Sequence, residues 1–132
     1  MIVVDTSVVV AIMRAEHDAA VWVTVLDQSP RSYMSVVTYV ETNMVMMGRR
    51  FRAQMNNVDR TLESLHVTVV PVTLDEGSIA RTAFIRFGKG RHSAALNLAD
   101  CFAYALAKRR NLPLLFKGDD FAKTDIVPAW LP

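Results

Sequence analysis

The chain has 132 residues, of which 52% are hydrophobic and 21% charged, so it is long enough to bury a core and too apolar to stay disordered. No stretch approaches the roughly 20 apolar residues of a membrane span, and the start lacks the pattern of a secretory signal. The net charge of +2 selects no partner, and one cysteine excludes an internal disulfide framework, so we expect one cytoplasmic domain over residues 1–132.

The first residues, Met-Ile-Val-Val-Asp-Thr-Ser, predict a short buried strand that ends at Asp5. A β-branched run without a polar face is typical of a central strand in a parallel sheet. Thr6 or Ser7 is then positioned to cap the helix that follows. The carboxyl ends of parallel strands are where ligands bind in open α/β sheets. For Asp5 alone, a turn or capping residue is the plainer interpretation.

The rest of the chain alternates between helix and strand patterns. Apolar positions at helical intervals predict helices over 8–13, 18–28, 36–48, a segment ending near 65, 73–87 and 96–110. Apolar or β-branched runs predict strands over 32–35, 66–71 and 114–116. This alternation indicates an α/β fold with a parallel sheet covered by helices on both faces.

Two of the predicted helices carry a carboxylate among apolar residues. At about 100° per residue, Asp100 falls within the apolar arc of Ala99, Ala103 and Ala107. Glu41 lies on the side of its helix that carries apolar residues such as Met44. A carboxylate on a buried face is costly unless it is paired or bound to a metal. The alternatives are a salt bridge to a buried base or a helix rotated toward solvent.

Further acids follow predicted strands, namely Asp5 and the neighbouring pair Asp119 and Asp120. Acids that converge without cations repel one another and their pKa values rise, and a divalent ion removes that repulsion. Oxygen-only ligands select Mg²⁺ or Mn²⁺, and a carboxylate cage around such an ion suits phosphoryl chemistry. The number of ions stays open.

Other catalytic arrangements are absent or weak. No Ser-His-Asp or Cys-His arrangement competes, and Cys101 and the three histidines lack zinc spacing. An aspartyl-phosphate phosphatase would want a second Asp two residues after Asp5, where this chain has Ser7. The alternatives carried forward are a metal-dependent phosphatase and a non-catalytic binding module.

Four segments together resemble a known family. They are Val3-Val4-Asp5-Thr6-Ser7, Val40-Glu41-Thr42, Leu98-Ala99-Asp100-Cys101-Phe102-Ala103-Tyr104-Ala105 and the stretch from Leu114 to Ile126 that contains Gly118-Asp119-Asp120-Phe121. In these segments the chain is similar to the PIN-domain ribonucleases, and more closely to the VapC-type toxins of bacterial toxin–antitoxin pairs. The resemblance implies a PIN-like α/β/α sandwich, an Mg²⁺- or Mn²⁺-dependent endoribonuclease, a homodimer and inhibition by a small antitoxin.

The same resemblance implies roles for particular residues. The implied catalytic acids are Asp5, Glu41, Asp100 and Asp119, with Asp120 as the alternative fourth acid. Asp5 and Asp100 are the first metal ligands, and the other acids are possible further ones. The implied supporting residues are Thr6 and Ser7 beside the first acid and Asn97 beside Asp100.

Basic and aromatic residues have weaker interpretations. A basic set could line a path for RNA, although a solvated face is the plainer interpretation for any one of its members: Arg49, Arg50, Arg52, Lys89, Arg91 and Lys117. Trp22, Trp130 and the methionines 44, 46 and 47 are expected to pack, and an exposed Trp could stack on a base. Any DNA contact would come through the antitoxin.

Overall fold

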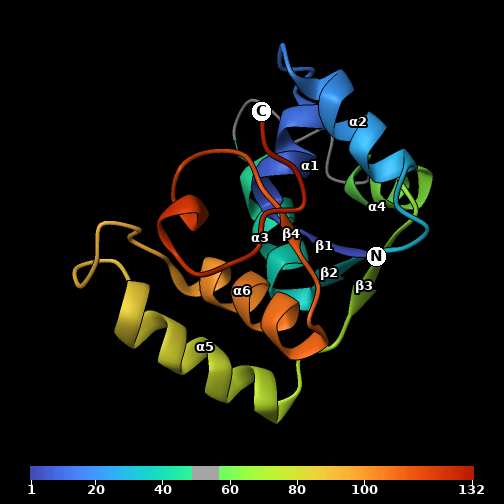
Figure 1. The fold of residues 1–132 in the computed structure, drawn as a ribbon. Helices are drawn as coiled ribbons and strands as arrows, with labels where there is room; N and C mark the ends of the chain where they lie inside the picture. Colours follow the sequence, from blue (N-terminus) through green and yellow to red (C-terminus); the bar gives the residue numbers. More distant parts are fainter. Residues whose placement is uncertain (49–56) are drawn as a thin grey trace.

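The fold is a parallel sheet between layers of helices, as the computed structural model of residues 1–48 and 57–132 shows (Figure 1). The strands are β1 (Ile2–Val4), β2 (Ser32–Ser35), β3 (Val67–Val70) and β4 (Leu114–Leu115). The helices are α1 (Thr6–Met13), α2 (Ala19–Asp27), α3 (Val36–Met46), α4 (Asn57–Ser64), α5 (Leu74–Phe87), α6 (Leu98–Arg110) and the short 3₁₀ helix η2 (Phe121–Lys123). The predicted sandwich with a central parallel sheet is confirmed.

The sheet has the strand order β3-β2-β1-β4, and every pair in it is parallel. β1 therefore lies inside the sheet, and its three residues are all buried, as the β-branched opening run predicts. Because parallel strands share one carboxyl edge, the residues after β1, β2 and β4 come together there. That edge is where Asp5 lies.

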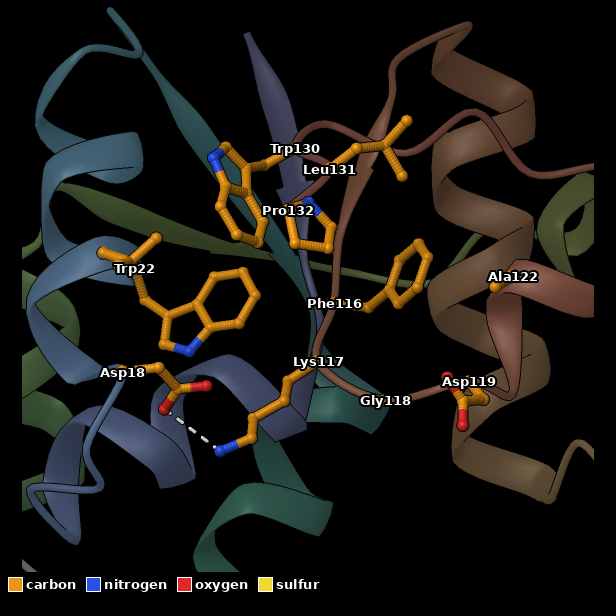
Figure 2. Close-up of a pocket in the computed structure, with 11 residues that line it drawn as sticks. Asp18, Trp22, Phe116, Lys117, Gly118, Asp119, Ala122, Trp130, Leu131 and Pro132 are labelled. Carbon is orange, nitrogen blue, oxygen red and sulfur yellow. Dashed lines mark hydrogen bonds and ion pairs between the residues drawn. The ribbon is translucent and has the colours of Figure 1, made fainter.

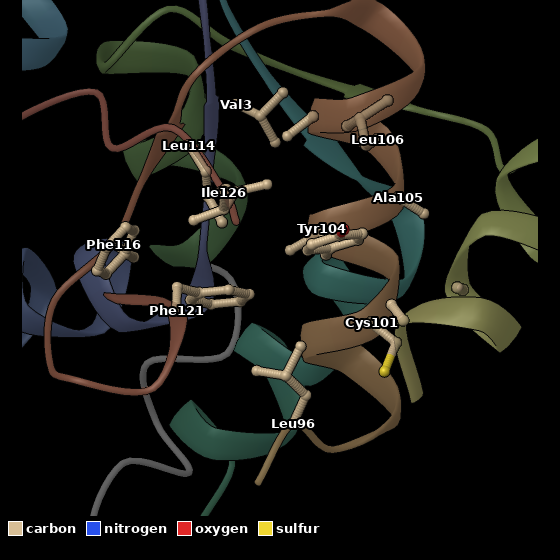
Figure 3. Close-up of a cluster of buried hydrophobic side chains, with 14 of the residues drawn as sticks. Val3, Leu96, Cys101, Tyr104, Ala105, Leu106, Leu114, Phe116, Phe121 and Ile126 are labelled. Carbon is tan, nitrogen blue, oxygen red and sulfur yellow. The ribbon is translucent and has the colours of Figure 1, made fainter. Parts of the chain in front are cut away.

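Two hydrophobic clusters cover the two faces of the sheet. Val3 and Leu114 belong to the cluster beneath α5 and α6, whereas Val4 and Leu115 belong to the cluster beneath α1, α2 and α4. This alternation is the period of two that a strand imposes on its side chains. Figure 3 shows the first cluster, in which Tyr104 of α6 lies near Leu114 and Ile126. The position of α6 across the sheet is thus set by apolar burial.

Local sequence signals explain the helix ends. Thr73 and Glu76 form the predicted capping box at the start of α5. Asn111 ends α6 in the left-handed conformation, with φ of 53°. Among the described residues, no helix is both long and apolar enough to cross a membrane.

The structure corrects one prediction at the start of α1. Asp5 itself is the N-cap, and neither Thr6 nor Ser7 caps the helix. The Asp5 carboxylate accepts a hydrogen bond from the backbone N–H of Ser7 at 3.0 Å. Asp5 therefore follows the end of β1 and also caps the start of α1. The capping bond fixes the direction of the Asp5 side chain at the sheet edge.

Candidate metal centre

Three carboxylates that are far apart in the sequence converge at the carboxyl edge of the sheet. Asp5 follows β1, Glu41 lies within α3, and Asp100 lies in the first turn of α6. One oxygen of each lies within 4.8 Å of the others, a separation that a single ion can bridge. The helix α3 packs against both α1 and α6, which brings Glu41 to the other two acids.

The Asp5 carboxylate has one satisfied oxygen and one unsatisfied oxygen. Its Oδ2 accepts hydrogen bonds from the Ser7 backbone N–H at 3.0 Å and from Ser7 Oγ at 2.7 Å. Its Oδ1 is buried and has no hydrogen-bond partner within the described residues. Burial, and to a lesser degree the charge of Glu41, raises the pKa of Asp5 above its ordinary value, although the bonds from Ser7 act against this.

The predicted contact between Asn97 and Asp100 exists, and it takes the form of a second capping box. The backbone N–H of Asn97 donates to Asp100 Oδ2 at 3.0 Å, and the Asp100 N–H donates to Asn97 Oδ1 at 2.8 Å. Burial, together with the charges of Asp5, Glu41 and Asp120, raises the pKa of Asp100 to about 7, although the hydrogen bond from Asn97 acts against this. Asp100 therefore takes part in the capping box of α6, and it is also an acid whose pKa is raised.

The sequence prediction for the Glu41 face of α3 is partly wrong. Met44 lies on that face and is 68% exposed, so the face does not belong to the core. The buried stripe of α3 is instead Thr38, Thr42 and Met46, which recur every four residues. The helix is rotated this way because buried hydroxyls, rather than apolar side chains, bond it to α1. Glu41 is consequently half-buried at the rim.

These hydroxyls form a buried network that no local sequence pattern indicates. Thr42 Oγ1 donates to Thr6 Oγ1 at 3.1 Å or to the Thr38 carbonyl at 2.9 Å, and Thr6 Oγ1 lies 3.3 Å from that carbonyl. Thr6 therefore bonds to α3, and its role as a supporting residue beside Asp5 stays a prediction. The network joins the residue after Asp5 to the residue after Glu41, so it sets the separation of the two acids.

No described basic residue pairs with the three acids. None of the ion pairs within residues 1–48 and 57–132 includes Asp5, Glu41 or Asp100. The alternative of a buried salt bridge thus finds no partner in the part of the chain that is described. An unpartnered buried oxygen, three converging carboxylates and purely oxygen donors fit a hard divalent cation.

The fourth acid is not among the three that converge. Asp119 lines a cleft between α2 and the end of β4, outside the group that could share one ion. Asp120 is the neighbour whose charge raises the pKa of Asp100. A fourth carboxylate at the metal centre thus stays a prediction, and the electrostatics favour Asp120 over Asp119.

The basic residues fall into three groups. Lys117 Nζ is held by Glu16 Oε2 at 3.2 Å and by Asp18 Oδ1 at 3.0 Å, a cluster that the sequence did not suggest. Lys89 and Arg91 are exposed in the loop after α5. The three arginines of the predicted basic turn lie outside the described residues: Arg49, Arg50 and Arg52.

Comparison with known proteins identifies a matching family and similar proteins. The PIN domain family matches residues 2–127. The Ribonuclease VapC of Mycolicibacterium smegmatis is 43% identical over 124 residues, which are 94% of this chain and 96% of that protein.

Solved structures show the same fold at low sequence identity. Mycobacterium tuberculosis VapC20, a Sarcin-Ricin loop cleaving toxin, has a TM-score of 0.76 at 18% identity and covers 96% of this chain and 97% of its own. A toxin–antitoxin complex from Klebsiella pneumoniae has a TM-score of 0.73 at 18% identity and covers 98% of both chains. Both likenesses support the α/β/α sandwich.

Proposed function

This chain belongs to the PIN-domain family, and within it to the VapC ribonucleases, and from that premise we propose that it is the endoribonuclease toxin of a type II toxin–antitoxin pair. We propose that it hydrolyses RNA with Mg²⁺ or Mn²⁺ held by Asp5, Glu41 and Asp100. The observation that carries this proposal is the convergence of three carboxylates, one of which, Asp5, has a buried Oδ1 without a described partner.

The three acids are proposed to have different roles, according to the contacts that each one makes. Asp5 is fixed by two bonds from Ser7, so it is the rigid ligand. Asp100 has one oxygen bonded to the Asn97 N–H, which leaves its other oxygen for the cation. When bound, the cation neutralises phosphate charge and lowers the pKa of a water. Glu41 is half-buried at the rim, and we propose that it orients the attacking water and takes its proton.

The proposed partners follow from the relatives and from one exposed surface. The toxin–antitoxin complex of Klebsiella pneumoniae supports a small antitoxin as partner, through which alone DNA would be contacted. We also propose a homodimer, because α3 exposes Val40, Met44 and Met47 on one side. The proposal includes a single domain over residues 1–132 and a cytoplasmic location.

Cleavage of RNA by purified protein, with and without Mg²⁺ or Mn²⁺, tests this function. Wild-type protein is expected to cut RNA only with the ion, and Asp5→Asn is expected to cut none. A phosphatase would instead hydrolyse a phosphomonoester and ignore RNA. A non-catalytic module would behave the same with and without Asp5→Asn. Growth arrest by the wild type, relieved by a small co-encoded protein, tests the toxin assignment.

A further inference from the structure

A cleft of about 550 Å³ lies beside the acid group formed by Asp5, Glu41 and Asp100 (Figure 2). The proposed metal site does not include it. It is bounded by α2, by the residues that follow β4 and by the last residues of the chain. Its principal lining residues are Trp22, Phe116, Lys117, Asp119, Trp130 and Leu131. The volume is within the range of small-molecule sites in proteins.

One hydroxyl group connects this cleft to the proposed metal centre. Ser7 Oγ accepts a hydrogen bond from the backbone N–H of Lys117 at 2.9 Å and donates to Asp5 Oδ2 at 2.7 Å. The wall of the cleft and the first acid are therefore neighbours across Ser7. In a nucleotide the base is one sugar ring away from the phosphate, so a cleft that adjoins Asp5 across Ser7 is within reach of a base.

The walls of the cleft suit a flat ring. Trp22 and Trp130 pack edge to face, with ring centroids 5.2 Å apart and planes at 76°. Figure 2 shows Phe116 across the cleft from Trp22. The Nε1–H of Trp22 is buried and makes no hydrogen bond of standard geometry to a described residue, but it lies close enough to the Asp18 carboxylate to help lower the pKa of that group. An indole N–H that is buried normally finds a partner.

The charges around the cleft disfavour an anion inside it. Lys117 Nζ is bound by both Glu16 and Asp18, and Asp119 adds another carboxylate to the wall. Acids thus outnumber the one cation, so a phosphate would be repelled there. An uncharged aromatic ring is not repelled, and it can stack on the aromatic wall.

We propose that this cleft binds one nucleobase of the RNA substrate, next to the phosphodiester bond that the acid group cuts. This inference rests on the proposed ribonuclease function and assigns it a substrate subsite. The base stacks against the aromatic wall that includes Trp130 and Phe116. Stacking on aromatic side chains tolerates any base, because every base has a π-face.

The test combines a protein variant with a substrate variant. The substrate is a short RNA that the wild-type protein cleaves with Mn²⁺, together with copies that carry an abasic residue on either side of the cut bond. Trp130→Ala is compared with Phe84→Ala, which removes a 39% exposed ring of α5 outside both the cleft and the acid group. Melting temperatures are recorded for each, because Trp130 packs on Trp22.

Trp130→Ala is expected to lower kcat/KM on intact RNA about tenfold, mainly through KM. With wild-type protein, kcat/KM on one of the two abasic copies should be lower than on intact RNA by a similar factor. On that same copy, Trp130→Ala should have the same kcat/KM as the wild type. Phe84→Ala should leave both values unchanged. The abasic copies are tested with wild-type protein, so they still show whether a base next to the cut bond contributes to cleavage if Trp130→Ala unfolds the protein.

Two results would overturn the subsite while leaving the ribonuclease intact. One is equal cleavage of intact and abasic RNA by the wild type. The other is a Trp130→Ala variant that cuts RNA normally but no longer binds the small co-encoded protein, which would make the cleft a protein-binding groove. If the wild type cuts no RNA, the ribonuclease function fails. In that case the subsite is tested by saturable quenching of tryptophan fluorescence with adenosine, which carries no phosphate. Absence of such quenching refutes the subsite.

Discussion

The two ends of α6 hold carboxylates in opposite settings. At the first turn, Asp100 faces Asp5 and Glu41, and burial raises its pKa to about 7. Near the last turn, Asp125 accepts hydrogen bonds from Tyr104 Oη at 2.6 Å and Lys108 Nζ at 3.1 Å. Burial acts to raise the pKa of Asp125, but these bonds outweigh it and the pKa is lowered.

The comparison of the two ends of α6 shows how a structural acid differs from a functional one. Asp125 has a hydroxyl and a cation at bonding distance, so the fold satisfies its charge. The acids at the other end of α6 have no described cation and leave Asp5 Oδ1 without a partner. A fold that keeps such repulsion is expected to be completed by a ligand of opposite charge. Four changes test this contrast.

The largest effect is expected from Asp5→Asn, which removes the charge of the most buried of the three converging acids. Asparagine still caps helices, so the variant should fold, and its metal-free stability should equal or exceed that of the wild type because repulsion is relieved. RNA cleavage should fall by at least about 10³-fold, because the transition state loses the cation. Cleavage rates and thermal melting check the two expectations. A variant that cuts within tenfold of the wild type contradicts them.

The next effect is a pH dependence of metal affinity. A cation must displace the proton of Asp100, whose pKa in the metal-free fold is about 7. Mn²⁺ should therefore bind about tenfold more weakly at pH 6 than at pH 8. Titration of Asp100→Asn serves as the control, since its residual binding should lose this dependence. An affinity that is flat between these pH values would refute the raised pKa.

The same pKa predicts a sign for stability. Asp100 keeps its proton to about pH 7 in the fold but only to about its ordinary value when unfolded. Between these values the folded state binds more protons, so its stability falls as pH rises through about 7. Asp125, with its lowered pKa, loses its contribution only when pH falls below the ordinary carboxyl range. Denaturant unfolding of Asp100→Asn and Asp125→Asn against pH separates the two.

A smaller effect is expected from Thr42→Val, which removes the hydroxyl that bonds to Thr6 Oγ1 or to the Thr38 carbonyl. Losing this link between α1 and α3 should cost about 1 kcal/mol of stability and weaken Mn²⁺ binding about fivefold, because Glu41 shifts relative to Asp5. Thr42→Ser should restore both. Thr82→Val is the matched control, since Thr82 bonds to the Ser78 carbonyl of its own helix at 3.2 Å. Equal metal affinity in both valine variants would make Thr42 merely structural.

The smallest functional effect is expected from Asp125→Asn at the satisfied end of α6. The change weakens the bonds to Tyr104 and Lys108 and should cost about 1 kcal/mol of stability. Metal affinity and RNA cleavage should not change. Calorimetric unfolding and Mn²⁺ titration of the same preparation check this. A loss of metal binding here would remove the contrast between the two ends.

Much of the fold could be predicted from the sequence because its signals are local. The β-branched run before Asp5 predicted the buried strand, and the capping box at Thr73 predicted the start of α5. Asp100 was found because alanines at helical spacing define a buried arc around it. In each case, neighbours within one or two turns determine the outcome.

The parts that could not be predicted depend on partners far along the chain. Thr42 meets Thr6 across 36 residues, and a threonine on a helix face gives no sign of such a bond. Lys117 meets Glu16 across 101 residues, and no periodicity announces that pair. The sequence left the N-cap of α1 open because Asp5, Thr6 and Ser7 are all good capping residues, and the structure assigns the cap to Asp5.

The most direct test of the account is a calorimetric titration of Mn²⁺ into metal-free wild-type protein and into Glu41→Gln. The three converging carboxylates predict saturable binding by the wild type, weakened at least tenfold when the Glu41 charge is removed. A wild-type protein that shows no saturable heat, or a Glu41→Gln variant that binds Mn²⁺ as tightly, would contradict the claim that these acids together hold a dication.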